Sequence, residues 1–342
     1  MSRSDVFVTP RGGLALCEAV VCDGFLADVP IRVQTHIHGD HMVEFETSKG
    51  FQRIIMSEPT RELLICELDA DIPFRNNIVA VDTGQPFRFG NTMIELESSG
   101  HMLGAVQVSI ESAHGAKAAY SGDFSWPLAR VLQTDVLVVD STYGSPDTVR
   151  NYSPSVAEAR LVELTIEHLQ QGPVHIKAHR GCLERALEAV NNEITVPIVA
   201  STKVCELAQV YRRFGYHIGD LIDVTTQEAA YAEEQGQYVR FYGKGDGDLF
   251  GITKGATIQV SAYMSDSDDP VIEWSPTAFR VAMSAHADFK GTMEYVAASG
   301  ASEVIVDNSR GGHPEELASA IRSQLGVHAA VSERRTSRYW GR

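Results

Sequence analysis

The chain has 342 residues, of which 44% are hydrophobic and 22% are charged, values that are ordinary for a globular protein. Its formal net charge of −16 excludes a surface that binds polyanions over most of its area, so any nucleic-acid contact must be local. The first residues contain no apolar core of signal-peptide length, and no run of about 18 apolar residues occurs, so we expect a cytoplasmic protein. The five cysteines form no CxxC pair, which disfavours a thiolate zinc site.

Short β-branched runs separated by turns dominate the chain up to residue 149. This pattern predicts a strand-rich first part. The expected strands cover residues 31–35, 92–97, 105–110, 117–123 and 135–144.

Helical and strand patterns alternate from about residue 150 to 281, which predicts a parallel sheet flanked by helices. The expected helices of this part cover residues 153–170, 182–192 and 203–215, and its strands cover 173–178, 196–201 and 257–264. A last unit follows, with helices at 290–299 and 314–325 and strands at 303–307 and 327–332.

The stretch "THIHGDHM" places three histidines and an aspartate directly behind the apolar run "IRV". His36 and His38 are two residues apart on an extended backbone, so their imidazoles point to the same side and can face one metal ion. Gly39 permits a sharp turn that swings Asp40 and His41 toward a neighbouring point. The spacing therefore predicts two adjacent metal sites.

Local residues cannot complete two coordination shells, so remote ligands are needed on the same face. His101 in "SSGHMLGA" and Asp123 in "YSGDFS" each follow a predicted strand and a glycine. A carboxylate at Asp123 could bridge two ions about 3.5–4 Å apart. Imidazole and carboxylate ligands favour zinc, with manganese as the alternative. We therefore expect two divalent metal ions as cofactors.

These motifs, in this order, resemble those of the metallo-β-lactamase fold. The stretch "LVVDSTYG" with Asp140 and the stretch "MSAHADF" with His286 resemble motifs of its β-CASP nuclease family, in the RNA-processing branch. The resemblance implies an α/β protein: a four-layer αββα sandwich with an inserted β-CASP α/β domain. It implies that residues 1–149 and 282–342 form the metallo-β-lactamase domain and that 150–281 form the insert.

The resemblance also implies a role for each residue. His36, His38 and His101 would bind one ion, Asp40 and His41 the other, and Asp123 would bridge them. His286 would protonate the departing 3′ oxygen of a phosphodiester, and Asp140 would orient that imidazole. The alternative for Asp140 is a purely structural role, in which its side chain caps the turn after its strand.

Two departures from the family pattern leave alternatives open. After "EVIVD", where the RNA-processing branch places another metal-binding histidine, this chain has Asn308. His313 could reach the second ion through a longer loop, or Asp307 or water could complete the shell; a helix start at His313 is the other interpretation. In the insert, "AHRGC" reverses the family's "GR" pair, and His179 and Arg180 are candidates for binding substrate phosphates at a helix start.

The leading hypothesis is a two-metal phosphodiester hydrolase that acts on RNA, in RNA processing or decay, with no membrane partner. The alternatives are a single-stranded DNA exonuclease of DNA repair, a non-nuclease metallo-hydrolase, and a non-catalytic scaffold subunit of a processing complex. The C-terminal stretch "RRTSRYWGR" could bind nucleic acid or a second subunit, so a homodimer stays open. Endonuclease or exonuclease action is not decided by the sequence.

Overall fold

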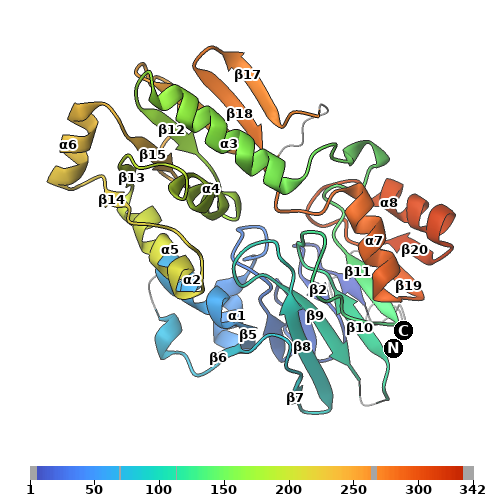
Figure 1. Ribbon diagram of the computed structural model, residues 1–342. Helices are drawn as coiled ribbons and strands as arrows, with labels where there is room; N and C mark the ends of the chain where they lie inside the picture. Colours follow the sequence, from blue (N-terminus) through green and yellow to red (C-terminus); the bar gives the residue numbers. More distant parts are fainter. Residues whose placement is uncertain (1–5, 69–70, 113, 263–267, 334–342) are drawn as a thin grey trace. The chain divides into compact units, whose positions relative to one another are not determined.

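The computed structural model describes residues 6–68, 71–112, 114–262 and 268–333 of a mixed α/β protein (Figure 1). The chain divides into two compact units, one made of residues 1–149 and 286–342 and the other of residues 150–285. The C-terminal arginine-rich stretch from Arg334 onward lies outside the described residues. No helix among the described residues is long and apolar enough to cross a membrane.

The first sheet of unit 1 has six strands in chain order. Its first three strands are antiparallel, and the remaining pairs are parallel. Helices α1 (Phe45–Phe51) and α2 (Glu58–Leu68) pack against its fifth strand, and the short 3-10 helix η2 (Ile72–Phe74) follows them. The strands are β1 (Phe7–Val8), β2 (Leu14–Ala15), β3 (Val20–Cys22), β4 (Ile31–Val33), β5 (Arg53–Ser57) and β6 (Ile78–Val81).

The second sheet of unit 1 combines strands from both segments of the chain, in the order β20-β19-β11-β10-β9-β8-β7. Strand β11 pairs in parallel with β10 on one side and with β19 on the other. Its strands are β7 (Phe87–Phe89), β8 (Thr92–Ser98), β9 (Val106–Glu111), β10 (Lys117–Tyr120), β11 (Val136–Val139), β19 (Glu303–Val306) and β20 (His328–Val331). The associated helices are η3 (Pro146–Thr148), α7 (Phe289–Ser299), α8 (Pro314–Ala320) and the π-helical turn η4 (Ile321–Leu325).

The side chains of β11 alternate between two hydrophobic clusters, and this alternation shows how unit 1 forms its core. Val136 and Val138 pack in one cluster with Ile31 and Val33 of the first sheet. Leu137 lies in a second cluster, with residues of α7 and α8. Because successive side chains of a strand point to opposite faces, the sheets share one core and the two helices cover the other face of the second sheet (Figure 1).

Unit 2 is a seven-stranded sheet, in the order β14-β13-β15-β12-β16-β18-β17, and its neighbouring strands are parallel except for β17 and β18. The helices are α3 (Pro154–Leu169), α4 (Cys182–Asn191), α5 (Thr202–Arg213) and α6 (Gln227–Gln235). The strands are β12 (Val174–Lys177), β13 (Ile198–Ala200), β14 (Ile222–Asp223), β15 (Val239–Tyr242), β16 (Ala256–Ser261), β17 (Val271–Ser275) and β18 (Ala278–Ala282).

The predicted alternation of helices and parallel strands after residue 150 is confirmed, with element ends that shift by a few residues. Helix α3 begins as the sequence suggests, because the Ser153 side chain accepts a hydrogen bond from Val156 N and Pro154 occupies the first turn. The sequence reading missed α1, α2 and α6. The first two are helices within the part that was expected to be strand-rich.

Leu137 provides a test of the core between the second sheet and its helices. It is fully buried, so Leu137→Ala should leave a cavity and lower the free energy of unfolding by about 2–5 kcal/mol. Leu68→Ala is the matched control, because Leu68 lies at the end of α2 and is 46% exposed; we expect a change within about 0.5 kcal/mol. Chemical denaturation measures both variants. Equal effects would contradict the assignment of this core.

Candidate functional site

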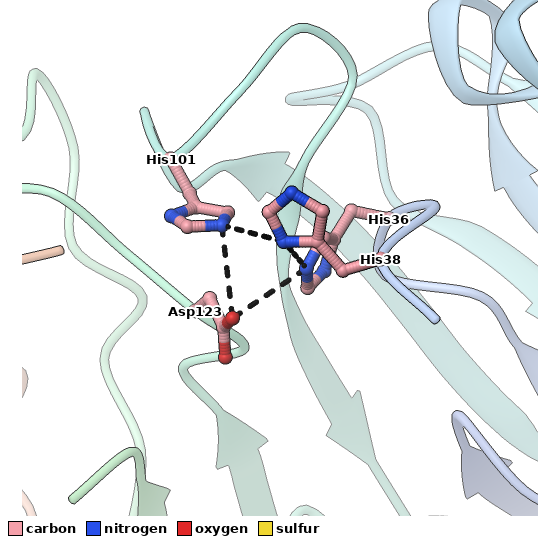
Figure 2. A group of neighbouring side chains, drawn as sticks. All are labelled: His36, His38, His101 and Asp123. Carbon is pink, nitrogen blue, oxygen red and sulfur yellow. Dashed lines mark hydrogen bonds and ion pairs between the residues drawn. The ribbon is translucent and has the colours of Figure 1, made fainter. Parts of the chain in front are cut away.

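Three loops of unit 1 bring together four side chains of the types that bind metal ions. His36 and His38 follow β4, His101 lies between β8 and β9, and Asp123 follows β10. One ligand atom from each residue lies within 4.8 Å of all the others, and Figure 2 shows the three rings and the carboxylate turned toward one another. Gly122 makes the approach of Asp123 possible: its φ is +57°, and a Cβ there would lie 2.7 Å from Val106 O.

The spacing of these atoms matches the ligands of one ion. His38 Nδ1 lies 3.1 Å from His36 Nε2 and 3.1 Å from His101 Nε2. Asp123 Oδ2 lies 3.5 Å from His36 Nε2 and 3.7 Å from His101 Nε2. A tetrahedral zinc ion with Zn–N distances of about 2.0–2.1 Å separates its ligand atoms by about 3.3–3.4 Å. The four atoms therefore fit the corners of one coordination shell.

The protonation of these rings also suits metal binding. Burial lowers the pKa of His36 well below its usual value, because it disfavours the charged ring. Burial likewise lowers the pKa of His38 to about 4, although the Asp123 carboxylate acts in the opposite direction. Both rings are thus neutral near pH 7, and only a neutral imidazole nitrogen can bind a metal ion.

His41 lies beside this group, among three carboxylates. Its Nδ1 is 2.7 Å from Asp23 Oδ2, and its Nε2 is 3.2 Å from Asp123 Oδ1 and 3.7 Å from Asp40 Oδ2. Burial opposes a charge on this ring, but the Asp123 and Asp23 carboxylates outweigh it and raise the pKa of His41 to about 10.

The Nε2 atom of His41 is buried and makes no hydrogen bond among the described residues, although the Asp123 and Asp40 carboxylates lie within 4 Å of it. A buried polar atom without a hydrogen bond usually has a further partner, such as ordered water or an ion. Asp40, His41 and Asp123 therefore offer a donor set for a second cation. That cation would take the place of the proton on the His41 ring, because only a neutral imidazole nitrogen binds a metal ion.

Asp23 is a residue that the sequence reading missed. Its carboxylate is fully buried and accepts hydrogen bonds from Thr35 N at 2.8 Å and Thr35 Oγ1 at 2.7 Å, in addition to facing His41 Nδ1. Its φ of +52° lies in the left-handed region, which Asp tolerates better than most residues. This carboxylate fixes which His41 nitrogen points toward Asp123. The only signal in the sequence is the pair "DG" behind a strand.

The side chains of His286 and Asp140 pair with each other next to Asp123. His286 Nδ1 is 3.3 Å from Asp140 Oδ2, and His286 Nε2 is 3.9 Å from Asp123 Oδ2. Burial lowers the pKa of His286, but Asp140 and Asp123 outweigh it, so the net shift is upward. Asp140 also accepts hydrogen bonds from Thr142 N and Thr142 Oγ1, so it orders the turn after β11 as well as facing the ring.

The structure does not bring His313 to either group. This side chain is 45% exposed at the start of α8, and its Nδ1 lies 3.3 Å from Glu316 Oε1. Asn308 donates through its amide to Ser332 O at 3.1 Å. Asp307 is buried and pairs with Arg310 at 2.9 Å.

His179 and Arg180 lie in unit 2, in the turn between β12 and α4. His179 is exposed and Arg180 is half-buried. The His179 carbonyl accepts hydrogen bonds from Cys182 N and Leu183 N, so this turn leads directly into the first turn of the helix.

Comparisons with known proteins relate the chain to two curated proteins. No family model matches the chain. It is 30% identical over 140 residues to the "Uncharacterized protein in lig 3'region" of Acidianus ambivalens, a match that covers 40% of this chain and 99% of that protein. It is 25% identical over 211 residues to an "RNase J-like protein" of Methanocaldococcus jannaschii, a match that covers 53% of this chain and 49% of that relative, about half its length.

A solved structure supports the fold alone. A protein of unknown function from Enterococcus faecalis V583 superposes with a TM-score of 0.61 at 14% identity, over 89% of this chain and 79% of that one.

Asp23 provides a stability test of the site. Asp23→Ala leaves both Thr35 donors without their buried acceptor and puts alanine in a left-handed backbone, so we expect a loss of about 1–3 kcal/mol. Asp23→Asn tolerates that backbone and retains one acceptor oxygen, so it should lose less. Urea denaturation of the metal-free proteins measures both. An alanine variant as stable as the asparagine variant would contradict this role.

Proposed function

We propose that this chain, which belongs to the same family as the uncharacterized Acidianus ambivalens protein, is a metal-dependent nuclease that hydrolyses RNA. The observation that carries the proposal is the group of His36, His38, His101 and Asp123, with His286 and Asp140 beside it. The name of the Methanocaldococcus jannaschii relative supports RNA over single-stranded DNA as the substrate.

We interpret the fold as a metallo-β-lactamase sandwich of four αββα layers. The shared core of the two sheets and the helices outside the second sheet support this interpretation. Unit 2, residues 150–285, would then be the inserted β-CASP domain. In that domain, His179 and Arg180 are proposed to bind substrate phosphates.

Two divalent ions, zinc in preference to manganese, are proposed for unit 1. His36, His38 and His101 would hold the first, Asp40 and His41 the second, and Asp123 would contact both. His313 would have to turn away from Glu316 to complete the second shell, and Asp307 would have to leave Arg310. When bound, such ions supply a hydroxide nucleophile at neutral pH and offset the charge of the attacked phosphate.

The chain's own residues supply the proton for the leaving group. Asp140 faces His286 Nδ1, which directs His286 Nε2 to the Asp123 side of the site. The upward shift of the His286 pKa favours the charged ring, which is the form that can donate a proton to the departing 3′ oxygen. Asp140 thus acts through His286 and holds its ring in place.

The activity itself is tested with matched oligonucleotides. The purified protein, supplied with zinc or manganese, should cleave an end-labelled RNA oligonucleotide faster than DNA of the same sequence, and a chelator should stop the reaction. Cleavage of DNA alone would replace this proposal with the DNA-repair alternative. No cleavage of either substrate by metal-loaded protein would overturn the nuclease assignment.

Metal content tests the ligand assignment. The parent protein should contain about two divalent ions per chain, and His38→Ala should lose at least one, because its Nδ1 lies centrally in the first group. His328→Ala is the matched control, since this exposed histidine of the same unit lies outside the metal cluster and pairs with Glu303 at 3.8 Å. Elemental analysis of dialysed protein gives the count. A parent without metal, or an unchanged His38 variant, would contradict the site.

His286→Ala separates proton donation from metal binding. Metal content and RNA affinity should persist while turnover falls about 10²–10⁴-fold. A substrate whose scissile 3′ oxygen is replaced by sulfur needs little protonation, so the variant should cleave it nearly as fast as the parent does. Asp140→Asn should show a smaller loss and the same rescue. If His286→Ala instead loses an ion and sulfur restores nothing, His286 is a ligand and the acid lies elsewhere.

A further inference from the structure

Arg32 is a fully buried arginine in the middle of the apolar strand β4. Burial lowers the pKa of its guanidinium to about 10, so the group is still charged near pH 7. No carboxylate forms an ion pair with this guanidinium in the part of the chain that the structure describes, although the more distant Asp23 and Glu44 carboxylates favour its charge. Its hydrogen bonds go to neutral oxygens, among them Val43 O at 2.8 Å, His41 O at 2.9 Å and Ser48 Oγ at 3.1 Å.

Gln34 is the second member of this buried network. Its Oε1 accepts two hydrogen bonds from Arg32, from Nε at 3.0 Å and from Nη2 at 2.7 Å. Arginine only donates, so it requires the oxygen of the amide to face it. The Gln34 Nε2 atom must then point the other way, where it donates to His36 O at 2.6 Å and to His41 O at 3.0 Å, with Asp23 Oδ1 as a third, longer partner at 3.3 Å.

Three hydrogen bonds of this pair end on the segment from His36 to His41, whose side chains include four of the proposed ligands. Gln34 holds the carbonyls at both ends of the segment, and Arg32 also holds the carbonyl of His41. Bulk solvent does not reach this network, because Arg32, Gln34 and His41 are all fully buried. Burying a charged group without an ion-pair partner is costly, and stability alone would be served as well by apolar side chains.

We propose that Arg32 and Gln34 are positioning residues that fix the backbone of the His36–His41 segment in its metal-binding conformation before an ion arrives. This inference rests on the proposed metal site and deepens it. A segment held in place loses less conformational freedom when the ion binds, so the pair raises metal affinity without touching the metal.

The test compares metal affinity with stability. In the double variant Arg32→Leu with Gln34→Leu, both polar partners become apolar together, which avoids leaving a buried charge unpaired. Zinc and cobalt affinities are measured by competition with a chromophoric chelator, and the unfolding of the metal-free proteins is measured in parallel. We expect metal binding about 10–100-fold weaker than in the parent, as when groups behind a metal ligand are removed.

Gln52→Leu is the matched control. Gln52 is also a buried glutamine of unit 1 whose amide donates to a backbone carbonyl, Val29 O at 2.8 Å, but it contacts no residue of the metal-binding segment. It should keep the parent's metal affinity even if it is less stable. Should the double variant not fold, Gln34→Met alone removes both carbonyl contacts of Gln34 but keeps the bond from Arg32 to His41 O, so it should show a smaller loss in the same direction.

Parent-like affinity in a folded double variant, or in Gln34→Met, would overturn the inference whatever the stability. A loss of the same size in Gln52→Leu would also overturn it, since the effect would then follow general destabilisation. Failure of the proposed metal site is distinguishable, because the parent itself would bind neither zinc nor cobalt.

Discussion

A single buried carboxylate organises the site. Asp123 is only 7% exposed, yet four imidazole rings face its two oxygens at distances of 3.2–3.9 Å. These rings are His36, His41, His101 and His286. Burial raises the pKa of Asp123, but the neighbouring His41 and His36 rings bring it well below its usual value, so the group is an anion. The fold must therefore hold all four rings around the single negative charge of Asp123.

The fold meets this requirement by placing the ends of several strands together. Asp123 and Asp140 follow β10 and β11, which are neighbouring parallel strands of the second sheet, so both carboxylates leave the sheet at the same edge. His36 and His38 follow β4 of the first sheet, which shares a core with the second. The chemistry is thus carried by loops, while the rigid parts of the unit fix their starting points.

The site residues that could be predicted from the sequence are those whose spacing along the chain is typical of metal ligands. His36, His38 and Asp123 were predicted because ligand-type residues recur behind strands and glycines, and the structure brings them together. Asp23, Arg32 and Gln34 could not be found in this way, since each is recognised only by the partners that surround it after folding. His313 shows the reverse: a plausible ligand type faces Glu316 instead, because helix α8 begins there.

Assembly of the second sheet has a consequence for synthesis. Strand β11 pairs with β19, from Val136 beside Glu303 to Val139 beside Val306, so all of unit 2 is translated between the two partners. Until the later strand leaves the ribosome, β11 presents an unpaired edge of four buried aliphatic residues, a surface on which strands of other chains can pair. The nascent protein therefore passes through a period in which most of its proposed ligand histidines exist while its sheet is open. Conditions that slow elongation or raise chain concentration would lengthen the exposure of that edge and favour aggregation over folding.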